Sequence, residues 1–264
     1  MAIEALGAEV SAAIASPGIV AATALYMFVL VPVVKASGLV DKTKGAYRRA
    51  MLAYNVIFSI YSALTFVVTA AALGWDRGYG QWLRDLTGDT VVSLYQDKCP
   101  STLFNSKLFM WAAWAFYYSK FVEFLDTVWL VLKGKPASFL QKLHHSGAPW
   151  DLYFQLVLQH EGVWIFVSFN SFIHTFMYAY YAITAVGIKC PAKSLITMMQ
   201  ISQFIIGFVA VYRYASIPCY YASKGLMFAW YFNYAYVGAI LLLFLHFFYV
   251  DNFVPKARLK EKGK

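Results

Sequence analysis

Imidazole, amide and phenol side chains recur at helical spacing within apolar stretches of this chain. Gln141 precedes His144 by three residues and His145 by four, so in a helix all three side chains can face one cavity. A second stretch has polar side chains at steps of four, namely Asn170, His174 and Tyr178, with Tyr181 close by. A lone buried histidine is often only a hydrogen-bonded core residue, whereas two on one helix and a third on the next indicate a functional site.

Two further apolar stretches carry polar side chains on one helical side. Lys120, Glu123 and Thr127 are spaced by three and four residues, and Asp126 lies beside them. Another stretch repeats a step of three through Thr197, Gln200 and Gln203. An ion pair that merely joins helices would also explain the charges. Ionisable groups at membrane depth are costly, however, and usually mark a functional path.

This set of groups permits acyl transfer. Imidazole can act as a nucleophile as well as a base. The acyl-imidazole that it forms is reactive, and it persists where a closed site excludes water. Amide side chains can stabilise the oxyanions that develop in such a reaction. No serine or cysteine with an obvious base lies in the same layer.

A histidine metal site is the rival interpretation. The chain has five histidines, and two of them, His160 and His246, lie near the ends of the apolar stretches. The other three histidines and two carboxylates could hold one metal ion, but hardly a di-iron centre. We therefore expect no metal site.

The elements that must position these groups are membrane helices. Apolar residues make up 61% of the chain and charged residues 13%, against about half and a quarter in soluble domains. Most of the apolar stretches exceed the ~20 residues that a helix needs to cross a bilayer. They run over 17–35, 50–74, 108–132, 137–159, 161–187, 194–216 and 225–250. We therefore predict an all-α, polytopic membrane protein with seven transmembrane helices in a single domain, residues 1–264.

The positive charges predict the orientation of the chain. With the N-terminus lumenal and the C-terminus cytosolic, fifteen lysines and arginines fall on the cytosolic side and five on the other. Residues 75–107 then form a lumenal loop with a short surface helix around 81–86, and 251–264 form a cytosolic basic tail. The net charge of +9 is thus mostly a topology signal, and we expect no nucleic-acid partner. The tail lysines resemble a retrieval signal of the endoplasmic reticulum, although a solvated basic tail would look the same.

The depth of the polar groups supports one shared site. Counted from the nearest cytosolic basic residues, at ~1.5 Å of rise per residue, they lie roughly 10–22 Å from the cytosolic boundary. Neighbouring helices run in opposite directions, so polar groups that served only as unrelated structural pairs would not need to lie at the same depth. A retinal protein is disfavoured because the seventh stretch has no lysine deep inside it.

The three cysteines divide between the two sides of this topology. Cys99 and Cys219 fall on the lumenal side and Cys190 on the cytosolic side. Because the lumen is oxidising, we expect a Cys99–Cys219 disulfide. Two free thiols are the alternative.

Four motifs follow one another along the chain in a fixed order. Lys120 begins K-x-x-E-x-x-D-T, Asn170 begins N-x-x-x-H-x-x-M-Y-x-Y-Y, and Thr197 begins T-x-x-Q-x-x-Q. Residues 141–145 occupy the place of an H-x-x-H-H box. In order and spacing, over residues 20–255, these motifs resemble those of the membrane fatty-acid elongases, the 3-ketoacyl-CoA synthases of the endoplasmic reticulum. The wider sequence is most similar to algal Δ9-elongases, which extend C18 polyunsaturated acyl chains to C20.

The resemblance implies a fold and a reaction. One peripheral helix would flank six helices that close around a narrow acyl tunnel. An acyl group from acyl-CoA would be transferred to His144 and then condensed with malonyl-CoA. His145 would orient His144 or act as a base, and His174 would assist decarboxylation or protonate the departing CoA.

The resemblance also implies roles for the remaining groups. Asn170, Gln141 and Gln200 would donate hydrogen bonds to thioester and enolate oxygens, and Asp126 belongs with the catalytic set. The expected substrate-binding residues are Lys120, Glu123, Thr127, Tyr178, Tyr181, Gln200, Gln203, Lys133 and Lys135. No cofactor is implied beyond the substrates acyl-CoA and malonyl-CoA. The implied partners are membrane lipid, the reductases and dehydratase of the elongation cycle, and a second copy in a homodimer.

One departure from the family motif matters. Gln141 stands where the box has its first histidine, and an amide can neither shuttle protons nor ligate a metal well. Two other functions remain open, which are an acyl-CoA transferase with a different acceptor and a lipid-binding or transport protein without the condensation. Release of carbon dioxide that depends on malonyl-CoA would separate both from an elongase.

Overall fold

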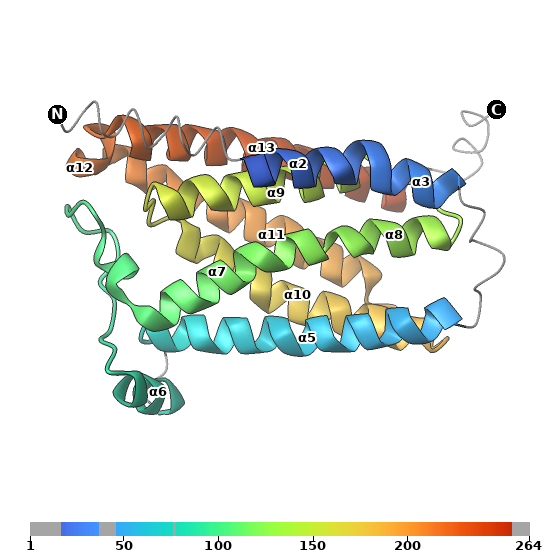
Figure 1. Ribbon diagram of the computed structural model, residues 1–264, viewed down its shortest axis with the longest axis horizontal. Helices are drawn as coiled ribbons and strands as arrows, with labels where there is room; N and C mark the ends of the chain where they lie inside the picture. Colours follow the sequence, from blue (N-terminus) through green and yellow to red (C-terminus); the bar gives the residue numbers. More distant parts are fainter. Residues whose placement is uncertain (1–16, 37–45, 76–77, 255–264) are drawn as a thin grey trace.

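The computed structural model describes residues 17–36, 46–75 and 78–254 of the 264-residue chain. Within these residues the protein is helical and has no β-strand. The long helices run side by side along the longest axis of the molecule (Figure 1). The ten C-terminal residues, which include the lysines of the predicted retrieval signal, lie outside the described residues.

The helices follow the predicted apolar stretches closely. The first stretch is one helical rod in three parts, α2 (Pro17–Ala24), the π-helix η1 (Leu25–Leu30) and α3 (Val31–Ala36). The other long helices are α5 (Ala46–Ala72), α7 (Lys107–Val122) with α8 (Phe124–Leu132), α9 (Phe139–Val157), α10 (Val163–Ala185), α11 (Lys193–Tyr212) and α13 (Lys224–Phe253). Short helices occur between them, namely α6 (Tyr79–Thr87), α12 (Pro218–Tyr221) and the 3-10 turns η2 (Thr102–Asn105) and η3 (Arg213–Ser216).

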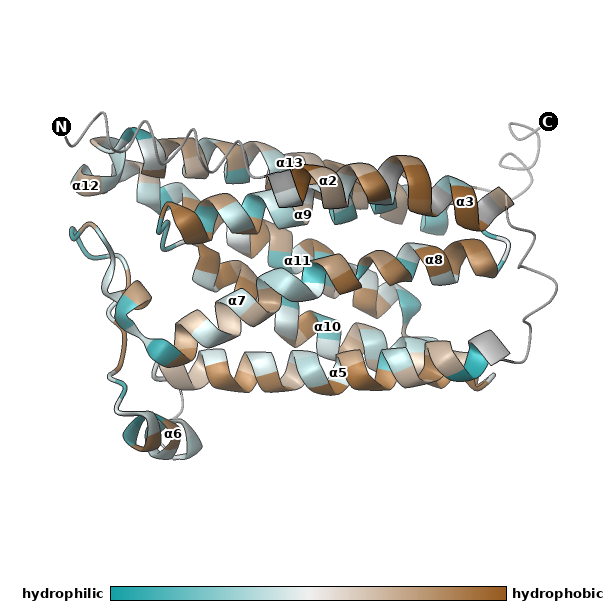
Figure 2. Ribbon diagram, viewed as in Figure 1, coloured by the Kyte–Doolittle hydropathy of each residue, from teal (hydrophilic) through white to brown (hydrophobic). Residues whose placement is uncertain are grey.

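Three helical segments of the described residues are long and apolar enough to cross a membrane. They cover Arg48–Ala72, Lys193–Ser216 and Lys224–Phe253. The remaining long helices carry most of the polar side chains on which the candidate site depends, and Figure 2 shows pale and teal positions among the brown ones in α7 and α10. The protein is therefore an all-α polytopic membrane protein, while the count of seven spans and the closed tunnel stay predictions.

Side chains at the helix starts explain where several elements begin. The hydroxyls of Ser106, Ser138 and Ser223 each accept a hydrogen bond from the backbone N–H three residues later, at 3.1–3.3 Å. Such caps satisfy an N–H that the first helical turn leaves unpaired. They fix the starts of α7, α9 and α13, which carry much of the candidate site.

Helix α10 lies at the centre of the packing. It contacts α5 along its length, and also α11 and α7. Helix α13 packs on α9 and α11, and the first helical rod packs on α8 and α9. Side chains of α10 that face these neighbours are buried, among them Asn170, His174 and Tyr178. The polar stripe predicted on this helix therefore points inward.

The predicted lumenal loop forms one end of the molecule, where Figure 1 shows α6 and α12. Helix α6, Tyr79–Thr87, covers the predicted surface helix and ends at Gly88, which takes the left-handed conformation with φ of 65°. Cys99 and Cys219 form a disulfide with their Cα atoms 5.9 Å apart, and Cys190 is free. The disulfide ties the loop to the connection between α11 and α13.

The buried carboxylate of Glu161 anchors the same loop. It accepts hydrogen bonds from the backbone N–H of Tyr95 at 2.6 Å, from the hydroxyl of Tyr214 at 2.7 Å, and from the hydroxyl of Ser101. Glu161 lies in the turn between α9 and α10. One side chain thus joins the loop, this turn and η3, which follows α11.

Candidate active site

A break in the third long helix sets the geometry of its charged residues. Helix α7 ends at Val122 and α8 begins at Phe124, so Glu123 lies at the junction. The ammonium Nζ of Lys120 donates to Oε1 of Glu123 at 2.7 Å, and both side chains are about 5% exposed or less. Lys120 also lies over the ring of Phe116, with Nζ 3.9 Å from its centroid. A buried pair of this kind needs further polar partners to offset the cost of removing both charges from water.

Helix α10 supplies those partners. Oδ1 of Asn170 accepts a hydrogen bond from Nζ of Lys120 at 3.0 Å, while its Nδ2 lies 3.1 Å from Nε2 of His174. The amide nitrogen has only protons to offer, so Nε2 of His174 accepts and its Nδ1 carries the proton. That Nδ1 lies 3.8 Å from Oε1 of Glu123. Two helices thus hold His174 between an amide and a carboxylate.

Asp126 faces α10 at a second point. Its Oδ2 accepts a hydrogen bond from the hydroxyl of Tyr178 at 2.8 Å. Tyr178 is fully buried and packs edge-on against His174, with ring centroids 5.4 Å apart, and against Tyr54 of α5 at 5.9 Å. The hydroxyl of Tyr54 is buried and lies close to the hydroxyl of Tyr178 and the carboxylate of Asp126.

Thr127 does not share the surroundings of Lys120 and Glu123, although helical spacing predicts one common face. Its Oγ1 accepts from Nε2 of Gln141 at 3.3 Å and lies 2.6 Å from the hydroxyl of Tyr26. The spacing prediction assumes an unbroken helix, and the junction at Glu123 breaks it. Thr127 therefore contacts α9 and the first helical rod rather than α10.

His144 and His145 lie together on α9. Their ring centroids are 5.2 Å apart, and the ring of His145 lies 6.2 Å from that of Tyr26. His145 is buried, whereas His144 is half-buried and no residue that the structure describes hydrogen-bonds to its Nδ1. His144 and His145 both interact electrostatically with His174 and with Lys120, so α7, α9 and α10 contribute to one site.

Helix α11 also brings polar side chains to α10, near Met177, which lies one turn after His174. Nε2 of Gln200 donates to Sδ of Met177 at 3.4 Å. The side chain of Gln203 is buried, and none of the described residues hydrogen-bonds to its Oε1. Thr197 is buried and donates to the backbone carbonyl of Lys193 at 3.1 Å.

The remaining predicted binding residues lie outside this buried group. Lys133 and Lys135 are exposed on the connection between α8 and α9. The side chain of Tyr181 is 40% exposed, and its ring centroid lies 6.3 Å from that of Tyr178. The helical spacing of these three residues does not predict whether their side chains are buried or exposed.

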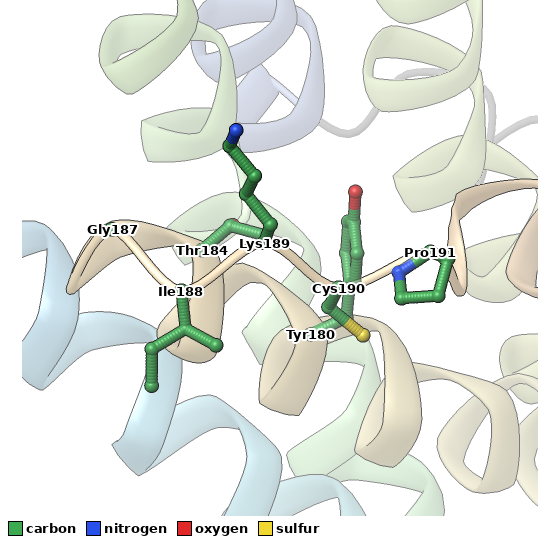
Figure 3. Close-up of a pocket in the computed structure, with 7 residues that line it drawn as sticks. All are labelled: Tyr180, Thr184, Gly187, Ile188, Lys189, Cys190 and Pro191. Atoms are coloured by element: carbon green, nitrogen blue, oxygen red, sulfur yellow. The ribbon is translucent and has the colours of Figure 1, made fainter.

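A pocket of about 470 Å³ opens at the turn between α10 and α11. It is lined by Tyr180, Thr184, Gly187, Ile188, Lys189, Cys190 and Pro191. In Figure 3 the ammonium of Lys189 and the hydroxyl of Tyr180 point the same way, and Ile188 points in the opposite direction. One cation and one phenol therefore border this pocket. The nearby Lys193 is bonded to Asp251 of α13 at 2.7 Å.

Several buried polar atoms of the site have no hydrogen-bond partner among residues 17–36, 46–75 and 78–254. They include Oε2 of Glu123, Nδ1 of His144 and Oε1 of Gln203. Buried polar atoms in folded proteins are nearly always hydrogen-bonded, so such orphans call for a ligand, a water or a catalytic role. In the part of the chain that the structure describes, no three histidine, cysteine, aspartate or glutamate side chains gather as a metal site would need.

Three contacts of the site were not predicted from the sequence. Tyr26 reaches Thr127 from the first helical rod, and the hydroxyl of Tyr236 on α13 donates to the backbone carbonyl of His144 at 2.8 Å. Nδ2 of Asn233 on α13 donates to the buried carboxylate of Asp151 at 2.8 Å. In the sequence, Asn233 and Asp151 are isolated polar residues within apolar stretches, and this pattern could have predicted that they are buried and bonded to each other. The tyrosines do not stand out among the twenty in the chain.

Comparison with known proteins identifies relatives along nearly the whole chain. The profile of the ELO: GNS1/SUR4 family matches residues 14–261. The chain is 30% identical to "Very long chain fatty acid elongase 7" of Drosophila melanogaster over 226 residues, which are 82% of this chain and 61% of that protein. It is 30% identical to the protein of the same name from Rattus norvegicus over 216 residues, or 76% of this chain and 69% of that one. It is also 32% identical over 180 residues to "Very long chain fatty acid elongase 4" of Trypanosoma cruzi, or 64% and 55%. The chain thus spans between 55% and 69% of the length of these relatives.

Proposed function

Because this chain belongs to the ELO: GNS1/SUR4 family, we propose that it is a fatty-acid elongase that condenses an acyl-CoA with malonyl-CoA. The products are a 3-ketoacyl-CoA two carbons longer, CoA and carbon dioxide. The names of the relatives support elongation, and the residues of the site support the chemistry.

One observation carries the choice of nucleophile. His144 is the half-buried member of the three histidines, and within the described part of the chain its Nδ1 has no hydrogen-bond partner. His174 is held between Asn170 and Glu123, so both of its nitrogens have polar neighbours. Reaction with a thioester needs a nitrogen lone pair that a substrate can approach. Nδ1 of His144 is itself buried, but no described residue occupies it, whereas both nitrogens of His174 are engaged, so His144 is the better candidate.

In the first half-reaction, Nδ1 of His144 attacks the carbonyl carbon of the acyl thioester. A C–N bond forms, the C–S bond breaks and CoA leaves as a thiolate. The acylated imidazole loses one proton, which passes through His145 and His174 to the sulfur of CoA. The amide of Gln141 and the ammonium of Lys120 stabilise the oxyanion that develops on the carbonyl oxygen.

In the second half-reaction, malonyl-CoA loses carbon dioxide and the remaining electron pair forms an enolate. The enolate carbon attacks the acyl carbon on His144, so that a C–C bond forms and the C–N bond breaks. The imidazole takes one proton back, and one proton is consumed in the whole reaction. Asn170 and Lys120, joined at 3.0 Å, stabilise the enolate oxygen.

The acyl and CoA parts of the substrates lie in opposite directions from His144 in this proposal. The acyl chain extends toward the disulfide-bonded end, between apolar helices. The CoA arm extends toward the end that carries Lys133, Lys135 and the pocket beside Lys189, whose cations attract its phosphates. The resemblance to algal Δ9-elongases supports C18 polyunsaturated acyl-CoA as the substrate.

We place the protein in the membrane of the endoplasmic reticulum, with its N-terminus lumenal and its C-terminus cytosolic. The bond between Cys99 and Cys219 supports this orientation, because disulfides persist in an oxidising lumen. The elongation cycle also needs two reductions and a dehydration. The corresponding reductases and dehydratase are the partners we propose, together with a second copy of the chain in a homodimer.

Intact-protein mass spectrometry tests the proposal. Purified protein is mixed with a C18 polyunsaturated acyl-CoA, first without malonyl-CoA and then with it. We expect a mass gain of one acyl group that malonyl-CoA removes as ketoacyl-CoA, with release of carbon dioxide. His144→Ala should abolish the adduct. His246→Ala, which removes an exposed imidazole near the end of α13, should leave it intact.

Three outcomes would overturn parts of the proposal. Ketoacyl product without any adduct would keep the elongase and remove the covalent step. A protein that binds acyl-CoA but yields neither adduct nor product, with any chain length, would instead be a lipid-binding or transport protein. Acyl transfer to an acceptor other than malonyl-CoA would identify a different transferase.

A further inference from the structure

The first helical rod contributes a side chain to the site. Tyr26 is 1% exposed, and its hydroxyl lies 2.6 Å from Oγ1 of Thr127 on α8. Its neighbours Leu25, Phe28 and Val29 are 58%, 76% and 46% exposed, as expected of side chains that face lipid. Tyr26 therefore points inward, whereas Leu25, Phe28 and Val29 of the same segment face outward.

The backbone of this segment is irregular where Tyr26 lies. Leu25–Leu30 forms a π-helix between two α-helices. Pro32 has no N–H to donate to the carbonyl of residue 28, so the regular pattern of hydrogen bonds cannot continue there. Single π-helical turns within α-helices occur frequently at functional sites. The irregular turn gives a reason to look for function at Tyr26.

The hydroxyl of Tyr26 is joined to Gln141 through Thr127. Oγ1 of Thr127 is shared by the phenol of Tyr26, at 2.6 Å, and by Nε2 of Gln141, at 3.3 Å. Thr127 is fully buried, so water does not compete for this oxygen. With Nε2 of Gln141 held by Thr127, its Oε1 must point away from Thr127. The position of one amide thus depends on a side chain from outside α9.

The ring of Tyr26 makes a second link. It stacks on Phe124 with centroids 4.3 Å apart, directly after the helix junction at Glu123, and it lies 6.2 Å from the ring of His145. A fixed ring at this place limits the orientations open to the imidazole of His145. Tyr26 therefore constrains both Gln141 and His145, the residues on either side of His144 in the 141–145 box.

We propose that Tyr26 is a positioning residue for the reaction, which orients the amide of Gln141 through Thr127 and the imidazole of His145 through its ring. This inference rests on the proposed elongase function. Tyr26 does not touch the reacting atoms. Its loss should slow acyl transfer to His144, because a disordered amide and imidazole reach the productive arrangement less often. It should leave the affinity for acyl-CoA unchanged.

The test compares Tyr26→Phe, Thr127→Val and the double variant in single-turnover acylation followed by mass spectrometry. The final amount of adduct reports the fraction of competent protein, and the rate constant reports positioning. For each single variant we expect a rate constant lower by about 3–10-fold, the effect of one hydrogen bond, with adduct amount and KM unchanged. The double variant should be no slower than the slower single variant, because both remove the same link.

The matched control is Thr23→Val on the same helical rod. Thr23 is also buried, but its hydroxyl donates to the backbone carbonyl of Ile19 at 2.8 Å and not to the site. It should acylate at the wild-type rate. Tyr26→Leu, which also removes the ring beside His145, should be slower than Tyr26→Phe.

The outcomes are separable. Wild-type rates in Tyr26→Phe, or a loss confined to the amount of adduct, would overturn the positioning role and leave the elongase untouched. Rate losses that multiply in the double variant would overturn the link through Thr127. A wild-type protein without adduct or product would overturn the elongase and this inference with it.

Discussion

The hydroxyl of Tyr236 donates a hydrogen bond to the backbone carbonyl of His144 across 2.8 Å. It joins α13 to the peptide unit of the proposed nucleophile. Pro149 lies five residues further along α9 and has no N–H, so the carbonyl of His145 lacks its helical partner. The two histidines thus lie where α9 lacks one backbone hydrogen bond, and the hydroxyl of Tyr236 from α13 holds the backbone there.

Tyr236→Phe should therefore slow the reaction without unfolding the protein. One neutral hydrogen bond contributes about 0.5–1.5 kcal/mol, which corresponds to a loss of about 3–10-fold in kcat. Steady-state turnover of acyl-CoA and malonyl-CoA measures it. Tyr231→Phe, at a position that is 62% exposed on the same helix, is the control. Equal kcat in both variants would contradict the role of Tyr236.

Gly147→Ala should be harmful for a related reason. Replacing glycine by alanine inside a helix is normally stabilising by about 0.5–1 kcal/mol. Here the new Cβ would lie 2.3 Å from a ring carbon of Tyr236, so the ring must move away from His144. We expect lower kcat and a lower Tm. In Gly238→Ala, inside α13, the new Cβ meets Phe208 at an ordinary 3.4 Å, so kcat should be unchanged and Tm should rise slightly. A more stable Gly147→Ala protein would refute the contact.

The pair of Lys120 and Glu123 allows a prediction about stability. Lys120→Met leaves the buried Glu123 without its cation, and breaking a buried pair in this way costs about 3–5 kcal/mol. Lys120→Met with Glu123→Gln removes both charges, so its Tm in detergent should lie well above that of the single variant. Neither should recover turnover, because Lys120 also bonds Asn170. A single variant as stable as the wild type would contradict this account.

Sequence spacing predicts the charged residues of the site, but it does not predict the contacts of Thr127 and Tyr26 that hold the site together. A step of three places Lys120 and Glu123 on one helix face, and a step of four does the same for Asn170 and His174. The structure joins the two pairs through the bond between Lys120 and Asn170. Spacing assumes regular helices, so it could not place Thr127, which follows a junction. It also gave no reason to single out Tyr26, because a phenol in an apolar helix looks like any interfacial tyrosine.

His160 predicts how stability depends on pH. It lies in the turn between α9 and α10, fully buried, and burial lowers its pKa from the ordinary value of 6.5 to about 3. Between these values the unfolded chain binds a proton that the folded protein does not bind. Acidification below pH 6.5 therefore destabilises the fold, by up to about 1.4 kcal/mol per pH unit.

Thermal unfolding in detergent between pH 7.5 and 5 tests this linkage. The Tm of the wild type should fall as the pH falls, and the fall should be smaller in His160→Gln, which has no group to protonate there. His246→Gln, from an exposed position, serves as the comparison. An identical pH dependence in the wild type and His160→Gln would show that His160 is not the group responsible.

The central claim is that His144 carries the acyl group, and peptide mapping by tandem mass spectrometry tests it most directly. The protein is quenched shortly after addition of acyl-CoA, or after a chase with malonyl-CoA. We predict an acyl group on His144 that the chase removes at least as fast as the enzyme turns over. An acyl group on another residue, or one that the chase removes more slowly than turnover, would contradict the claim.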